Sequence, residues 1–248
     1  MLAEYTCEEI AAALDDVAAA TLDEAGVEGP PVNAVAVAAR LGIWVGRDDR
    51  QQGRARYVRL GARQAVPPVA AILLRDEPRP ERRQWAVAHE IGEHLAHEVF
   101  ERLAIDPRVA GPNARERVAN AMAGRLLVPA CWLACENRRA DGDLLLLKQV
   151  FSTASHELLA RRLLEQPAPA ILAIWDQGSL AWRAWNRGGR PPPPTAAEIS
   201  CRARAFVSAE SQEAWQGANR VRAWPVHEPG WQREIVRVEL PEYEVDEA

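Results

Sequence analysis

Long apolar runs are absent from this chain of 248 residues, and so is a basic amino terminus. No stretch approaches the roughly 18 consecutive apolar residues that a membrane-spanning helix needs. The first residues are acidic, with Glu4, Glu8 and Glu9, whereas a secretory signal begins with positive charge. The sequence therefore predicts a cytoplasmic protein without a membrane span.

Cysteine and lysine are also scarce. The four cysteines are too few and too scattered for a disulfide framework, and we expect their thiols to be buried. They are Cys7, Cys131, Cys135 and Cys201. Lys148 is the only lysine among 30 basic residues, and the arginines alternate with acidic residues at a net charge of −5. Because basic charge is not gathered in one module, the composition argues against direct nucleic-acid binding.

Apolar side chains, at 48% of residues, suffice to bury a core without disulfides. Helical periodicity predicts an opening helix between Thr6 and Gly26, where Thr6 and Glu9 have the spacing of a capping box. A long helix is predicted from Pro80 to Leu103. Between these two helices the patterns predict a helix at 32–41 and strands at 43–45, 55–60 and 69–74.

The pattern of secondary structure changes in the carboxy-terminal third, from helices to strands. Helical patterns continue at 114–128, after a capping Asn113, and at 143–164. Beyond residue 170 lie six of the nine tryptophans. Strands are predicted there at 171–175, 180–185 and 235–240, the first two forming a hairpin. We therefore predict an α+β fold with a helix at 1–27, a mainly helical core with a small sheet at 28–166, and a β-rich region at 167–248.

Three of the five histidines, His89, His94 and His97, fall within nine residues of the long helix. At about 100° per residue, His89 and Glu93 lie about 40° apart, whereas His89 and His94 lie about 140° apart. A zinc peptidase of the HExxH type needs two ligands one turn apart, a glutamate next to the first ligand, and a third ligand from elsewhere. The string HEIGE supplies His89 and Glu90, but Glu93 occupies the second ligand position.

The third ligand is sought on the following helix, where Glu116, Asn120 and Ala123 share a face. Glu116 has an alternative role, because Asn113 and Glu116 have the spacing of a capping box. Asn120 either orients a ligand or fills a polar gap between helices. A local bulge in the long helix would instead bring His94 inward as a replacement ligand.

Two stretches carry a specific resemblance. The segments RRQWAVAHEIGEHL and ERVANAMAGRLLVP resemble the ImmA/IrrE family of metallopeptidases, whose pattern is AHExGH followed by ExxANxxAxxLLxP. The resemblance extends over residues 28–166 and implies a zincin-like metallopeptidase core. It also implies that His89 is a zinc ligand, that Glu90 is the general acid/base and that Glu116 is the third ligand. Glu93 stands where the family has its second histidine, and a carboxylate there favours harder cations such as Mn²⁺ more than an imidazole does.

The sequence thus predicts a cytoplasmic metal-dependent endopeptidase, with a divalent cation held by His89, Glu93 and Glu116. The strand at 69–74 is expected to offer an edge to an extended peptide. The resemblance implies a helix-turn-helix transcriptional repressor as the substrate, and hence a role in stress-responsive transcription. The alternative is a catalytically impaired module that binds a regulatory protein without cleaving it.

Overall fold

The computed structural model describes residues 4–50, 53–61 and 69–241 of the chain. The fold is α+β, as predicted, and the chain divides into two compact units. The amino-terminal unit comprises the residues up to Arg139 together with Lys148–Ser155. The carboxy-terminal unit comprises Ala140–Leu147 and the residues from His156 onward. The three-part division of the sequence stays a prediction.

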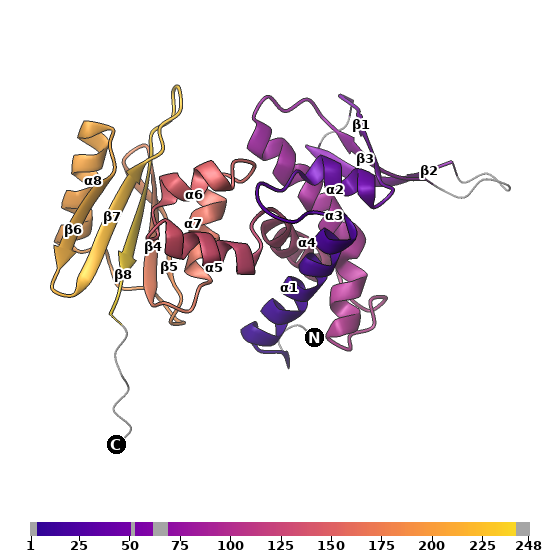
Figure 1. The fold of residues 1–248 in the computed structure, drawn as a ribbon, viewed down its shortest axis with the longest axis horizontal. Helices are drawn as coiled ribbons and strands as arrows, with labels where there is room; N and C mark the ends of the chain where they lie inside the picture. Colours follow the sequence, from indigo (N-terminus) through magenta and orange to yellow (C-terminus); the bar gives the residue numbers. More distant parts are fainter. Residues whose placement is uncertain (1–3, 51–52, 62–68, 242–248) are drawn as a thin grey trace, which may run out of the picture. The chain divides into compact units, whose positions relative to one another are not determined.

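Helices dominate the amino-terminal unit, and α3 (Pro80–Arg102) is the longest of those described. It packs along α4 (Pro112–Leu127), and α1 (Cys7–Glu24) lies against both (Figure 1). Smaller helices α2 (Ala34–Arg40) and α5 (Ala130–Arg139) complete this part, while α6 (Leu144–Val150) begins in one unit and ends in the other. The fully buried side chains between these helices include Val17, Val87, Ile91, Met122 and Leu126.

Local signals set the ends of several helices. Thr6 and Glu9 form the predicted capping box at the start of α1, and Pro80 occupies the first turn of α3. The prediction for Asn113 was wrong, because the N-cap of α4 is Gly111 and the helix already begins at Pro112. Proline is favoured at a first helical position, where its missing N–H costs nothing. Glu116 therefore takes no part in a capping box.

A small sheet lies beside α3 in the amino-terminal unit. Its strand order in the described part is β1 (Trp44–Arg47), β3 (Val69–Leu74), β2 (Ala55–Leu60). Strand β3 pairs in parallel with β1 and antiparallel with β2. The expectation that residues 69–74 offer an edge was therefore wrong, because both sides of β3 are paired. The edge beside α3 belongs to β2, which contacts that helix.

The carboxy-terminal unit is built on a five-stranded antiparallel sheet, as far as the structure describes it. Its order is β5 (Ser179–Trp185), β4 (Ala170–Asp176), β8 (Arg233–Glu239), β7 (Asn219–Pro225), β6 (Gln212–Gln216). The predicted hairpin is confirmed in β4 and β5, which are joined by Gln177 and Gly178 at positive φ. Strand β8 confirms the predicted final strand.

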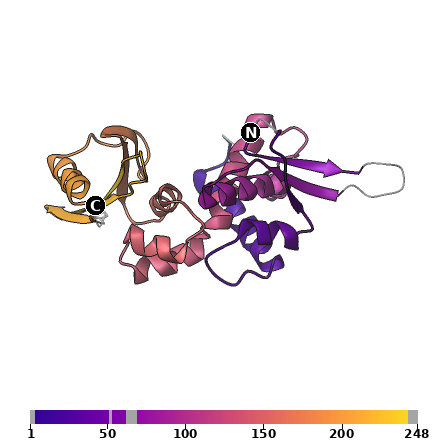
Figure 2. The ribbon, with the colours of Figure 1, turned by 90° about the horizontal axis from the view of Figure 1, so that it is seen from above.

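Helices cover this sheet. Helix α8 (Ala196–Ser208) lies along one face, where Cys201 and Ala205 pack on Val221 and Val236 (Figure 2). Helix α7 (His156–Leu164) contacts β4. The helical patterns predicted at 143–164 correspond to α6 and α7, which are separated by residues 151–155. Helices α5 and α8 and strands β6 and β7 were not predicted as separate elements.

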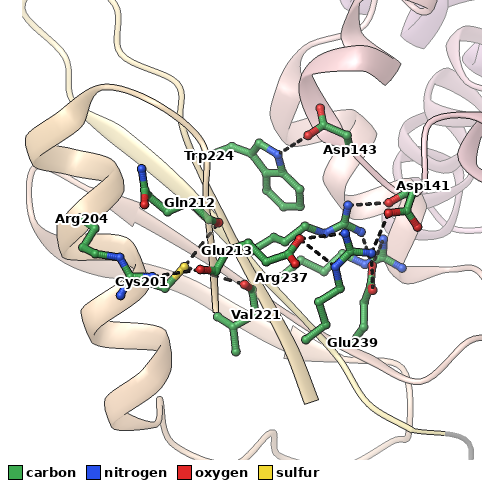
Figure 3. Close-up of polar contacts among 12 residues, drawn as sticks. Asp141, Asp143, Cys201, Arg204, Gln212, Glu213, Val221, Trp224, Arg237 and Glu239 are labelled. Atoms are coloured by element: carbon green, nitrogen blue, oxygen red, sulfur yellow. Dashed lines mark hydrogen bonds and ion pairs between the residues drawn. The ribbon is translucent and has the colours of Figure 1, made fainter. Parts of the chain in front are cut away.

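Two buried arginines stand directly opposite each other on the sheet face away from Cys201. Arg222 of β7 pairs with Arg237 of β8 in the strand register, and both side chains are buried. Glu239 forms ion pairs with both guanidinium groups and lies 3.1 Å from Nη1 of Arg237. One partly exposed carboxylate thus serves two buried cations. Figure 3 labels Glu239 and Arg237 of this group.

The turn at residues 140–143 covers these arginines. Arg222 donates a hydrogen bond to the carbonyl oxygen of Asp141. Nε1 of Trp224 donates to Asp143 over 3.3 Å (Figure 3). Gly142 has φ of +67°, and a Cβ there would lie 2.4 Å from Nη2 of Arg222. Only glycine fits this turn, since any side chain would displace the arginine.

The cysteines carry no disulfide. Cys201 is buried as predicted, but Cys7 and Cys131 are exposed and Cys135 is partly exposed, so the expectation of buried thiols was wrong for those positions. None of the described helices is by itself long and apolar enough to cross a membrane. By length and composition alone, the bent pair of α4 and α5 meets the requirement.

Candidate metal centre

His89 and Glu93 lie one turn apart on α3, as the helical spacing predicts. The opposite stripe of this helix is apolar and fully buried, including Val87, Ile91 and Val99, and this burial fixes the rotation of the helix. His89 and Glu93 are left half-buried on the side that faces a cavity. The amphipathic pattern thus points the two side chains toward the cavity together.

Glu116 reaches the same place from α4. The ligand atoms of His89, Glu93 and Glu116 all lie within 4.8 Å of one another, and Nε2 of His89 is 3.6 Å from Oε2 of Glu116. Nδ2 of Asn120 donates to Oε1 of Glu116 over 2.9 Å and to its backbone oxygen over 3.0 Å. Asn120 therefore orients Glu116, and it does so from one turn further along the same helix.

Gly92 permits the close approach of the two helices. A Cβ at this position would lie 2.7 Å from the carbonyl oxygen of Ala119 and 3.0 Å from Cβ of Met122. Those distances are shorter than van der Waals contact, so a side chain at position 92 would push α4 away. The short separation of α3 and α4 is what brings Glu116 next to His89.

Glu90 is a buried carboxylate beside the three candidate ligand residues, with 9% of its surface exposed. Burial raises the pKa of its carboxyl above the ordinary value of 4.5, and the nearby Glu93 and Glu116 act in the same direction. The backbone N–H of Tyr57 opposes this increase by donating to Oε2 of Glu90 over 2.6 Å. The hydrogen bond also fixes the orientation of the carboxylate against strand β2.

The other two histidines lie outside the three-residue cluster. His94 is half-buried, and its ring stacks at a tilt on Tyr57 with 5.1 Å between centroids. Burial lowers the pKa of His94, and the charges of His97 and Arg59 lower it further. His97 is exposed, with Nδ1 3.0 Å from the carbonyl oxygen of His94. Helix α3 is continuous through these positions, without a bulge that would turn His94 inward.

A cavity of about 530 Å³ opens above the cluster, between α3, α4 and β2. Sequence reasoning missed the contribution of β2 to this cavity. The cavity residues that were not predicted are Ala55, Arg56, Tyr57, Arg59 and Arg115. The alternating pattern of 55–60 predicted a strand but carried no signal for its position, because only tertiary packing brings that strand to α3.

The donor set can hold a divalent cation. Imidazole nitrogen and carboxylate oxygen both bind zinc at about 2.0–2.2 Å. The mutual distances of the three donors allow one ion to contact them all after small side-chain rotations. Each anionic ligand weakens the Lewis acidity of the ion and makes Mn²⁺ more competitive with Zn²⁺.

The fold of the amino-terminal unit is of the metallopeptidase type. Residues 38–164, about half of the chain, match the family of M78 peptidases described as the IrrE N-terminal-like domain. The chain therefore belongs to this family, which confirms the resemblance found in the sequence.

A solved structure of a Mycobacterium tuberculosis transcriptional regulator has a similar fold. The two chains are 17% identical, with a TM-score of 0.62 over 95% of this chain and 89% of that one. At this level of identity the similarity concerns the fold alone. Among curated proteins, none matches this chain.

Proposed function

We propose that this protein is a metal-dependent endopeptidase whose cation, zinc or manganese, is held by His89, Glu93 and Glu116. The observation that carries the proposal is the convergence of these three ligand atoms within 4.8 Å beside a buried glutamate. A bound cation would polarise the scissile carbonyl and lower the pKa of a water molecule. Because two of the three donors are carboxylates, the bound cation would be a weaker Lewis acid than the ion of a two-histidine site.

Glu90 is the proposed general acid/base. Its raised pKa suits a group that must take a proton from water and return it to the leaving amine, because proton transfer is most efficient when the pKa is near the working pH. The Tyr57 N–H holds Oε2, so Oε1 is the oxygen left to accept the proton. Strand β2 therefore positions the proposed base.

The same strand supports binding of an extended substrate. The N–H of Arg75, just after β3, donates to the carbonyl of Arg54, just before β2, so the hydrogen-bonded pair next to Ala55 and Leu74 continues the β2–β3 register. By antiparallel alternation, Tyr57 then directs its backbone groups away from β3, in agreement with its bond to Glu90. An extended peptide would pair with the backbone groups of this edge that Glu90 does not occupy, and it would pass the proposed catalytic groups.

We infer that the substrate is a regulatory protein, namely a helix-turn-helix repressor, and that cleavage takes place in the cytoplasm. Membership of the IrrE N-terminal-like family supports this inference. The structural neighbour is itself named a transcriptional regulator, which is in keeping with a role in transcription.

The test is incubation of the full chain with the purified helix-turn-helix repressors of the same genome, in the presence of Zn²⁺ or Mn²⁺. We expect the wild type to cleave at least one repressor and Glu90→Gln to cleave none while still binding metal. Glu101→Gln is the matched control, since Glu101 is an exposed residue of the same helix. If wild type and Glu90→Gln leave every repressor intact with either metal, the endopeptidase proposal is wrong. Binding of a repressor without cleavage would instead favour the role of a binding module.

A further inference from the structure

Two exposed cations line the cavity on the side of β2. Arg56 and Arg59 both belong to β2, both are exposed, and both contribute to the cavity wall. Within the part of the chain that the structure describes, neither guanidinium group forms a hydrogen bond or an ion pair. Arg47 and Arg54 provide a contrast on the same small sheet, since they pair with Asp49 and Glu77 respectively.

The acidic residues of the cavity, Glu90, Glu93 and Glu116, form no ion pair with these arginines within the part of the chain that the structure describes. Glu90 accepts the backbone N–H of Tyr57, and Glu116 accepts from Asn120 and faces His89. On the α4 side, Arg115 also lines the cavity, and its Nη2 donates to the carbonyl oxygen of Pro107 over 2.8 Å. A carbonyl contact leaves the full positive charge of Arg115 uncompensated.

Arg56 and Arg59 flank the residue of β2 that contacts Glu90. Tyr57 is the residue of β2 whose N–H contacts Glu90. Arg56 comes directly before it and Arg59 follows two positions later. A peptide added to the edge of β2 would therefore have one arginine on each side of the point opposite Glu90.

We propose that the cavity selects an extended segment with acidic side chains on both sides of the scissile bond, which Arg56, Arg59 and Arg115 bind through their guanidinium groups. This inference rests on the proposed function, because it names the substrate of that same site. Guanidinium groups match carboxylates in shape and charge, and complementary charge gives selectivity against the wrong partner. A basic segment would meet three uncompensated cations at the same positions.

The experiment measures binding separately from cleavage. Three otherwise identical extended peptides carry Glu, Gln or Lys around a central apolar pair, and each is titrated into zinc-loaded Glu90→Gln protein by calorimetry. Cleavage of the same peptides by the wild type is followed by mass spectrometry. We expect the Glu peptide to bind at least about tenfold more tightly than the Gln peptide, as two or three partly exposed ion pairs allow. The preference should fall at high salt, because exposed charges are screened.

Variants locate the selectivity. The double change Arg56→Glu and Arg59→Glu should reverse the order of the Glu and Lys peptides. Arg82→Glu is the control, since Arg82 is an exposed residue of α3 outside the cavity, and it should leave the order unchanged. Equal binding of the three peptides, absence of binding, or the same reversal in Arg82→Glu would overturn the proposal. Selective binding of the Glu peptide without cleavage would support the acidic selectivity of the cavity and count against the endopeptidase proposal. Cleavage without a charge preference would support the endopeptidase proposal and overturn the acidic selectivity.

Discussion

The two charged clusters of this protein differ in burial and in the use of their charge. In the amino-terminal unit, the side chains of His89 and Glu116 are 18% and 59% exposed and face a cavity. In the carboxy-terminal unit, the side chains of Arg222 and Arg237 are 7% and 6% exposed and share the carboxylate of Glu239. The first cluster has donor atoms that converge on open space, whereas the second is closed by the shared carboxylate of Glu239 and by the turn at residues 140–143.

This difference separates charged groups that stabilise the fold from charged groups that can bind a ligand. Removing charges from water is costly unless each is paired, so a buried cluster must satisfy itself and its partners become part of the fold. An exposed cluster stays solvated and can keep donor atoms for a ligand. On this basis the two clusters should respond differently to substitution. The open cluster, formed by His89, Glu93 and Glu116 with the adjacent Glu90, should lose ligand binding. The closed cluster, formed by Arg222, Arg237 and Glu239, should lose stability.

The largest expected effect is the loss of metal binding in His89→Ala. Removing one of three protein ligands should weaken zinc affinity at least about 100-fold, beyond the 10–100-fold typical of residues that only support a ligand. Zinc content after dialysis and calorimetric titration measure this effect. His97→Ala, on the same helix but exposed, should retain the metal. Stoichiometric zinc in His89→Ala would remove the proposed site.

Substitution in the closed cluster should instead lower the stability of the fold. Glu239→Gln leaves Arg222 and Arg237 without their shared anion and should lower the free energy of unfolding by about 2–3 kcal/mol, slightly below the cost of breaking a fully buried pair. Urea unfolding followed by tryptophan fluorescence measures the change. Glu210→Gln, an exposed position in the same unit, should cost less than about 0.5 kcal/mol. A zinc affinity that fell along with stability in Glu239→Gln would contradict the separation of roles.

Gly92→Ala tests whether helix separation sets the open cluster. The added Cβ would lie 2.7 Å from the Ala119 carbonyl, and forcing a methyl group into a packed interface costs about 1–3 kcal/mol. Because α4 carries Glu116, zinc affinity should fall about two- to tenfold if roughly half of that cost appears in metal binding. Gly29→Ala, where a Cβ would meet open space, is the control for both measurements. Unchanged zinc affinity would show that Gly92 does not set the site.

The smallest expected effect is a pH dependence at Glu90, the one strongly buried member of the open cluster. Its pKa is raised in the folded protein, mainly by burial. The unfolded chain therefore releases this proton first as pH rises, and stability falls between pH 4.5 and the higher pKa of the folded state. In metal-free protein, thermal unfolding midpoints from pH 4 to 8 should show the wild type losing stability relative to Glu90→Gln across that window. A difference that is constant with pH would argue against the raised pKa.

Much of the amino-terminal fold could be predicted because its signals are local. Capping at Thr6, proline at the start of α3 and the apolar period of that helix each act within a few residues. The fold of the carboxy-terminal unit was harder to predict from the sequence. The Thr195 and Glu198 capping box of α8 was present in the sequence and was overlooked. In β7, a buried arginine at position 222 interrupts the apolar pattern, and its ion pair with Glu239 of β8 explains why it can be buried.

The sequence by itself determined the pairing of His89 with Glu93, because helical geometry relates residues four positions apart without any other part of the chain. It also determined the family, through motifs on two successive helices. Tertiary structure alone decided that Glu116 comes within reach of His89, since this depends on how closely α3 and α4 pack at Gly92. It alone placed β2, rather than β3, at the edge beside α3, with Tyr57 bonded to Glu90 and the exposed Arg56 and Arg59 beside it. Contacts between distant segments follow from packing, which local patterns do not encode.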